Sequence, residues 1–157
     1  MEAKLEKKLA DMVRSNRLAG LGTLREGAPL VSLVAYLPED DFSAFYIHVS
    51  QLAQHTQGML VDPRVGLLIS EADDGRTDPQ TLARISIFGT AEQIGTDDTT
   101  YQSIRSLYIL RFPQSGPLFG FGDFGLWQIV PQSARFVAGF AQAFNLTLDA
   151  LKRVAKR

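Results

Sequence analysis

The sequence predicts an α+β domain built around an antiparallel sheet or barrel. Seven short segments alternate apolar and polar residues as strands do, helical spacing appears at both ends of the chain and between strands, and turn residues separate the segments. The 157 residues suit one domain with a sizeable core, and no repeat, long linker or low-complexity segment divides them. We therefore expect a single domain over residues 1–157.

The N-terminal third combines one helix with three strands. Residues 3–16 place leucine, methionine and valine side chains at helical spacing. Strands are expected at 18–24, 30–37 and 43–50, joined by short turns that contain glycine, proline or acidic residues. Short turns between successive strands are typical of an antiparallel meander.

The rest of the chain alternates helices and strands. A short helix is expected at 51–61, with Ser50 as its cap and Asp62-Pro63 ending it. The later elements are a strand at 65–72, a loop at 73–83, a strand at 84–94, a helix within 96–112 that ends before Pro113, strands at 124–130 and 134–144, and a basic C-terminal helix capped by Thr147.

Composition narrows the classes of function. A net charge of -1 gives no reason to expect nucleic acid or an anionic membrane as a partner. The absence of cysteine excludes disulfides, thiol nucleophiles and cysteine-ligated metal centres. The N-terminal segment lacks the apolar core of a signal peptide, and no apolar run approaches the ~18 residues of a membrane span. We expect a cytoplasmic protein.

Three familiar site patterns are disfavoured. The stretch GFGDFG at 120–125 has the spacing of a dinucleotide-binding loop, but it precedes a predicted strand instead of following one and opening a helix. His48 and His55, the two histidines, have no metal-ligand spacing. A Ser-His-Asp triad would have its residue types but lacks a nucleophile elbow. We expect no metal site.

Alternation in two predicted strands points to a binding surface. The faces concerned carry Ser32, Val34 and Tyr36 in the strand 30–37, and Tyr46, His48 and Ser50 in the strand 43–50. If the two strands pair as a hairpin, both faces line one surface beside the start of the 51–61 helix. The unpaired amides and positive dipole end of that helix suit an anion such as phosphate.

His55 and Thr56 would add an imidazole and a hydroxyl to this anion site, and Arg84 would bring a positive charge at the start of a later strand. Each also has a simpler interpretation. His55 can be a half-buried histidine bonded to backbone, Ser50 a plain helix cap, and Arg84 a solvated strand end. The tyrosines and the tryptophan are most often core or interface residues.

Two motifs identify a family resemblance. Ser50 to Thr56 reads SQLAQHT, and Asp62 to Leu68 reads DPRVGLL. In this order, with the strands around them, they resemble the pyridoxamine 5'-phosphate oxidase-like FMN-binding split barrels, most nearly the haem-utilisation branch. The resemblance covers about residues 5–145. It implies an antiparallel split β-barrel of about six to seven strands with flanking helices.

The resemblance also implies a cofactor and an assembly. It implies an FMN-dependent oxidoreductase with an unknown small-molecule substrate, acting as a homodimer with the FMN groove at the subunit interface. No side chain is identified as a catalytic acid or base. The implied FMN contacts are Ser32, Leu33, Val34, Ala35 and Tyr36 along the isoalloxazine edge, Ser50, His55 and Thr56 at the phosphate, and Arg84 near the pyrimidine side.

Departures from the family pattern bear on the reaction. Gly58 and Gly66 replace a motif asparagine and serine, and 138–143 replaces a glycine-rich element. True pyridoxamine phosphate oxidases carry basic residues at the positions of Ser32 and His55, so that specific activity is not expected. Two alternatives stay open: a non-catalytic protein that binds FMN, haem or another planar ligand, and a deazaflavin-binding relative.

Overall fold

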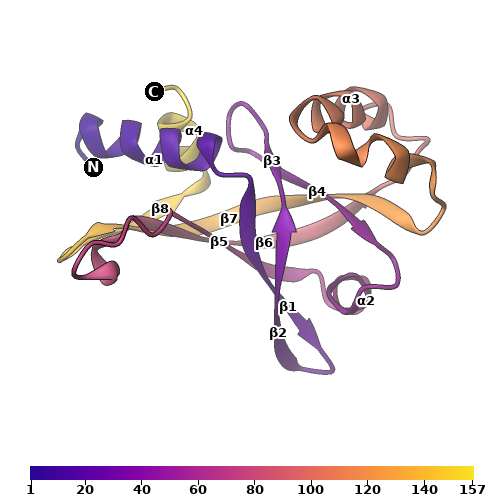
Figure 1. The fold of residues 1–157 in the computed structure, drawn as a ribbon, viewed down its shortest axis with the longest axis horizontal. Coiled ribbons are helices and arrows are strands. Elements are labelled where there is room, and N and C mark those ends of the chain that lie inside the picture. The colour runs from indigo at the N-terminus through magenta and orange to yellow at the C-terminus, as the bar shows by residue number, and fades with distance from the viewer.

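The computed structural model describes residues 1–157 and contains one eight-stranded antiparallel sheet with helices around it (Figure 1). The elements are α1 (Ala3–Ser15), β1 (Leu18–Arg25), β2 (Ala28–Ala35), β3 (Leu37–Pro38), β4 (Phe45–Ser50), α2 (Gln54–Val61), β5 (Arg64–Ser70), η1 (Pro79–Thr81), β6 (Arg84–Ile94), α3 (Tyr101–Arg111), η2 (Pro113–Gly120), β7 (Phe124–Gly139), β8 (Gln142–Thr147) and α4 (Leu148–Val154). The predicted α+β split-barrel class is confirmed, with eight strands in place of six to seven.

The strand order is β2-β1-β5-β6-β7-β4-β3, with β8 pairing on β7. The conditional hairpin of 30–37 with 43–50 is wrong, because β2 pairs along its whole length with β1, and β4 pairs with β3 and β7. The short hairpin from Leu37 through Phe42 occupies one edge of β4, and Phe42 turns it with a φ of 58°. Both edges of β4 are therefore taken before β2 could reach it.

The last two predicted strands are divided differently in the structure. The strand β7 continues through Pro131, and a turn at Ala141, whose φ is 58°, then leads into β8. Pro131 is tolerated because it lies opposite Gly89, where a β-bulge interrupts the pairing of β6 with β7. The segment 134–144 is therefore the end of one strand, a turn and the start of the next.

Of the two helix caps predicted from the sequence, one is confirmed and one is wrong. At α4 the prediction is confirmed, because Thr147 Oγ1 accepts a hydrogen bond from the Ala150 amide at 3.2 Å. At α2 the cap prediction is wrong: the helix begins at Gln54, and Ser50 lies at the end of β4. Ser50 Oγ instead accepts a bond from the Leu52 amide in the connecting turn.

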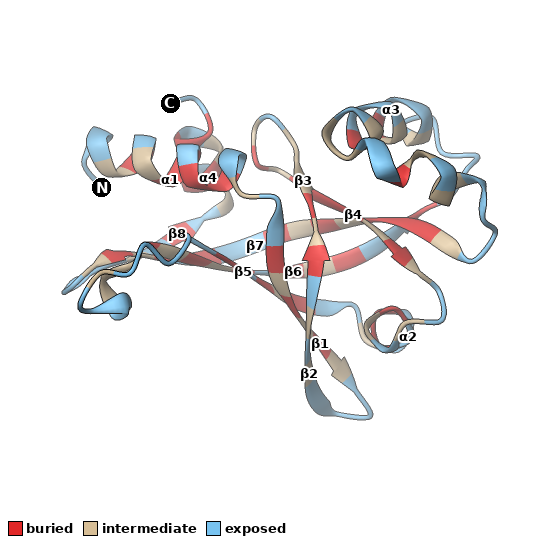
Figure 2. Cartoon of the chain, in the orientation of Figure 1, coloured by how far each residue is buried: buried red, intermediate tan, exposed pale blue.

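The main core of 30 buried residues fills the interior of the barrel. A smaller cluster around Tyr46, Ile104 and Leu126 lies between α3 and the outer face of β4 and β7. Helices α1 and α4 pack together, while α2 lies at the opposite end of β1 and β2 (Figures 1 and 2). No helix is long and apolar enough to cross a bilayer.

Candidate functional site

Three glycines leave part of the outer sheet face without side chains. The strand register aligns them in two rows that cross β2, β1, β5 and β6 in that order. One row is Leu33, Gly20, Leu68 and Ser86, and the next is Val31, Gly22, Gly66 and Phe88. We call the residues of these two rows the glycine face.

Four of the side chains that border the glycines are apolar and open to solvent. Val31 is 77% exposed, Leu33 70%, Phe88 51% and Leu68 48%, whereas Val34, Leu67 and Ile87 on the other side of the same strands are buried in the core. Exposed stretches of β1 and β2 are visible in Figure 2. A contiguous apolar surface on a folded domain typically marks a binding site.

Two adjoining cavities follow the glycine face, of about 250 and 360 Å³. Both are lined by Gly22, Val31, Gly66 and Phe88. Arg64 is the only charged residue in either lining, and its guanidinium pairs with Asp62 at 2.6 Å. The floor is thus flat and apolar, with one cation at its rim.

The predicted contacts of β2 divide between two faces. Leu33 lies on the glycine face, and Ala35 follows it on the same side of the strand. Ser32, Val34 and Tyr36 point the other way, and Tyr36 is completely buried, with its hydroxyl donating to the Val13 carbonyl at 2.6 Å. The face expected to line the site is therefore the inner one. Burial raises the pKa of the Tyr36 hydroxyl.

The second group of predicted contacts gathers at the start of α2. Thr56 is 1% exposed, and its hydroxyl donates to the Ser50 carbonyl at 2.7 Å, so this proton is used within the fold. The Nε2 atom of His55 is buried without a partner, and burial lowers the pKa of its imidazole. The amides of Gln54, His55 and Thr56 precede the first intrahelical bond, which leaves them free to meet an acceptor.

Arg84 lies at the start of β6, on the side of the strand that carries Ser86 and Phe88. Its guanidinium donates to the Gln80 and Leu82 carbonyls at 2.9 and 3.1 Å, which ties the charge to the preceding loop. The structure therefore brings Leu33 and Arg84 to one outer face and Ser50, His55 and Thr56 to another place.

His48 lies in an aromatic enclosure on the outer side of β4. Its ring stacks on Phe119 with centroids 3.7 Å apart, and the rings of Tyr108 and Phe124 lie within 6.0 Å. Its Nδ1 atom is buried without a hydrogen-bond partner. Burial lowers the pKa of His48 from 6.5 to about 4.

This burial predicts an acid sensitivity that can be measured. Below pH 6.5 the unfolded chain gains a proton at His48 that the native state takes up only near pH 4, so the free energy of unfolding falls across this window. We expect His48 to contribute up to about 3 kcal/mol of that fall. His48→Phe keeps the stacking and removes the proton, so urea unfolding at several pH values should show a flatter dependence in this variant. Identical slopes in the two proteins would contradict the assignment.

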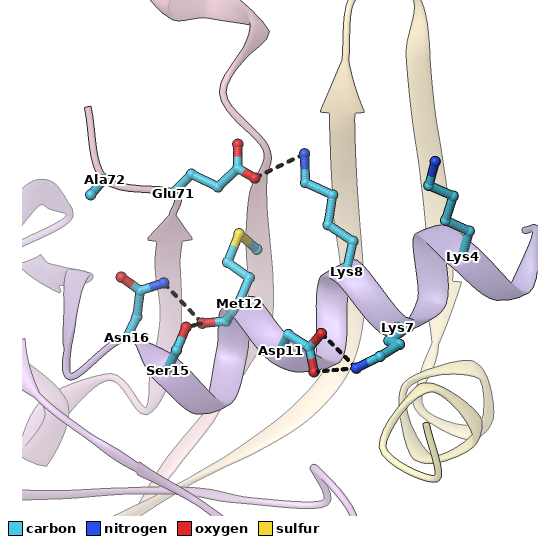
Figure 3. Close-up of a pocket in the computed structure, with 9 residues that line it drawn as sticks. All are labelled: Lys4, Lys7, Lys8, Asp11, Met12, Ser15, Asn16, Glu71 and Ala72. Carbon is cyan, nitrogen blue, oxygen red and sulfur yellow. Dashed lines mark hydrogen bonds and ion pairs between the residues drawn. The ribbon is translucent and has the colours of Figure 1, made fainter. Parts of the chain in front are cut away.

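A separate groove of about 580 Å³ lies between α1 and the chain that follows β5 (Figure 3). Four of its five charged groups pair with one another: Lys8 bonds Glu71 and Lys7 bonds Asp11, each at 2.8 Å. None of the predicted contact residues lines this groove. No cluster of three or more histidine, aspartate or glutamate side chains is placed to hold a metal ion.

Comparison with known proteins finds relatives in sequence and in fold. No protein-family model matches the chain. The chain is 34% identical to the chloroplastic heme oxygenase HOZ of Arabidopsis thaliana over 76% of its own length and 35% of HOZ. It is 22% identical to the heme oxygenase HutZ of Vibrio cholerae, over 96% of the chain and 86% of HutZ. A protein of the pyridoxinephosphate oxidase family from Clostridium acetobutylicum has the same fold, with a TM-score of 0.69, 13% identity, and 96% and 99% of the two chains covered.

The chain has the split-barrel fold of the pyridoxamine 5'-phosphate oxidase-like proteins, and its sequence is similar to haem-utilisation proteins of that fold. A solved structure of a heme binding protein from Mycobacterium smegmatis is also similar, with a TM-score of 0.82 and 25% identity over 95% of this chain and 60% of that one. The chain therefore spans about a third of HOZ and less than two thirds of the mycobacterial protein.

The glycines of this split barrel were the residues that sequence reasoning missed. Gly20 and Gly22 are two apart in a strand, so they share a face, and Gly66 follows in the strand that pairs beside them. Alternating glycines on one side of a predicted strand are a detectable signal, because they mark a close approach by another molecule or backbone. Which partner strand continues the row could not be read from the sequence.

Proposed function

We propose that this chain binds haem, with the porphyrin lying against the glycine face. The observation that carries the proposal is the pair of rows in which three glycines are bordered by exposed apolar side chains. The names of the relatives, two heme oxygenases and a heme binding protein, support haem over other planar ligands.

The residues of the glycine face suit the porphyrin ring of haem but supply no ligand for its iron. The absence of a Cβ at Gly20, Gly22 and Gly66 allows a flat ring to approach the backbone, and the apolar border suits its hydrophobic faces. No histidine, tyrosine or methionine lines either cavity, so the face offers none of the usual axial ligands. Bound haem would supply a redox-active iron, while these residues supply shape and apolar contact.

The rim provides a candidate contact for the ligand's carboxylates. Arg64 lines the second cavity, and its side chain is 73% exposed, beside Asp62. A propionate can approach this guanidinium from the solvent side, since arginine holds a carboxylate through two parallel hydrogen bonds. These residues would therefore hold haem by apolar contact with its ring and by one ion pair between Arg64 and a propionate.

A second copy of the chain is the proposed cover for the glycine face. Val31 and Leu33 belong to a contiguous group of exposed apolar side chains, which is unusual on the surface of a monomer. They also lie on β2, an edge strand of the sheet, which is open to pairing with another chain. Two copies that meet through this face would bury both edge strands and enclose the ligand between them. This is the homodimer with an interfacial site that the family resemblance implies.

The experiment is a pair of titrations on the purified chain. Adding hemin should produce a shifted, saturable Soret band at a fixed ratio of hemin to chain. Adding FMN under the same conditions should leave flavin fluorescence almost unchanged. Saturable binding of FMN together with a hemin spectrum equal to that of hemin in buffer would replace the proposal with a flavoprotein.

A flavin is the second candidate ligand, and one observation favours it. The start of α2 presents three free amides and the unpartnered Nε2 of His55, a combination that suits the phosphate of FMN. This candidate retains the proposal of a flavin-dependent oxidoreductase. No lysine or arginine occupies the first turn, so the site lacks the permanent cation that usually strengthens phosphate binding.

The flavin candidate gives a distinct expectation. If His55 holds phosphate, His55→Ala should weaken FMN binding about tenfold and leave riboflavin, which has no phosphate, unaffected. Fluorescence titration of both flavins measures the two affinities. An equal loss for both ligands would show a folding defect and would argue against phosphate contact.

A further inference from the structure

We infer that a cavity at the ends of β4, β6 and β7 binds a small uncharged ring that carries an amide or keto oxygen. The cavity has a volume of about 240 Å³ and is separate from the glycine face and from the start of α2. It is walled by the loop 120–125, whose GFGDFG sequence resembled a dinucleotide-binding loop. The loop precedes the strand β7, so it serves here as a cavity wall.

The central observation is an unsatisfied donor. Trp127 is 3% exposed, and its indole Nε1 is buried with no hydrogen-bond partner. An indole nitrogen can only donate, so the missing partner must be an acceptor. Buried donors in folded proteins are nearly always paired, which makes an unpaired one an indication of an absent ligand or water.

Two amide side chains converge on the same point. A Cβ built on Gly125 would lie 3.1 Å from Gln93 Nε2, 3.5 Å from Trp127 Nε1 and 3.9 Å from Gln51 Nε2. Gly125, Gln51 and Gln93 all line the cavity. Three nitrogen atoms from three different elements therefore lie in front of Gly125. Gln51 and Gln93 line the cavity and Trp127 does not, so a ligand reaches the buried indole nitrogen by displacing the side-chain amide of the exposed Gln93.

The remaining walls define the kind of ligand. Phe119, Phe121, Phe124 and Tyr101 supply aromatic surface, and no charged side chain lines the cavity. An ionised ligand would lack a counter-charge, whereas an amide can accept from the indole and exchange hydrogen bonds with the two glutamines. The volume is below that of a drug-sized pocket, so one ring fills it.

Benzamide is a suitable probe, because it is an uncharged ring with one amide. Trp127 is the only tryptophan of the chain, so its fluorescence reports directly on the site. We expect benzamide to change that fluorescence saturably, and toluene, which has no acceptor, to bind at least fivefold more weakly. Benzoate should also bind more weakly, because its charge would be buried without a partner.

Variants separate a real site from a buried water. Gly125→Ala keeps the tryptophan but fills the space in front of it, and should weaken benzamide binding more than tenfold. Gly116→Ala is the matched control, since its Cβ would meet only one side-chain atom, at 3.9 Å. In calorimetric titrations, Trp127→Phe should weaken benzamide about fivefold and leave toluene unchanged.

If benzamide leaves the tryptophan fluorescence unchanged, or if Gly125→Ala and Gly116→Ala bind it equally, the indole is satisfied by water or by a rotated Gln93 amide. The test does not involve haem or FMN. Its failure would therefore leave the proposed function standing, and a failed hemin titration would leave this site standing.

Discussion

Replacing Gly89 by alanine is expected to lower the free energy of unfolding by about 3 kcal/mol or more. The new Cβ would lie 2.2 Å from the Val130 carbonyl oxygen, 2.9 Å from its carbon and 3.2 Å from Pro131 Cα. All three atoms belong to the backbone of β7, which cannot move aside without breaking the bulge that joins the two longest strands. The clash therefore affects the centre of the sheet, and urea denaturation measures its cost.

Gly66→Ala is the matched control for this prediction. Gly66 lies in the neighbouring strand β5, and its Cβ would meet only the Ile87 carbonyl oxygen at 3.8 Å, an ordinary contact. We expect its unfolding free energy to change by less than ~1 kcal/mol. If the two variants unfold at the same urea concentration, the close approach of β6 and β7 at Gly89 is wrong.

Replacing Leu33 by glutamate is expected to weaken hemin binding at least a hundredfold and to yield a monomer. Leu33 is 70% exposed and lies beside Gly20, so the change should leave the chain folded. In the proposed complex the new carboxylate would lie against the porphyrin and the second subunit, where an unpaired charge is very unfavourable. Soret titration measures the binding, and light scattering measures the mass.

Leu110→Glu is the control for the charge itself. Leu110 is 78% exposed, but it lies on α3, away from the glycine face. This variant should bind hemin and assemble as the unmodified chain does. Equal hemin affinity in the Leu33 and Leu110 variants would exclude the glycine face as the haem site.

The sequence carried enough local information to predict most elements. Leu5, Leu9, Met12 and Val13 define one face of α1, and Thr147 caps α4 as expected. Ser50 misled the prediction of α2, because a serine before a helical pattern is equally suited to end a strand. The carbonyl and hydroxyl oxygens of Ser50 accept hydrogen bonds from the turn that follows. A serine can serve either as a helix cap or in such a turn, and the path of the chain after β4 decides between the two.

The site was harder to predict than the fold. Alternation in 30–37 correctly separated two faces, but it could not say which one is inside. The polar and aromatic face of Ser32 and Tyr36 was interpreted as the open one, whereas the tyrosine hydroxyl finds a carbonyl on α1 and the ring fills the core. The apolar face of Leu33 is left outside, because the glycines opposite it offer nothing to cover it.

The most direct test of the central claim is to locate the porphyrin on the chain. Gallium protoporphyrin, a diamagnetic analogue of haem, can be titrated into isotope-labelled protein while all backbone amide resonances are followed by NMR. We predict that the amides of Gly20, Gly22 and Gly66 shift most, and that those at the start of α2 stay in place. Shifts confined to His55 and Thr56, or none at any of these positions, would contradict the account.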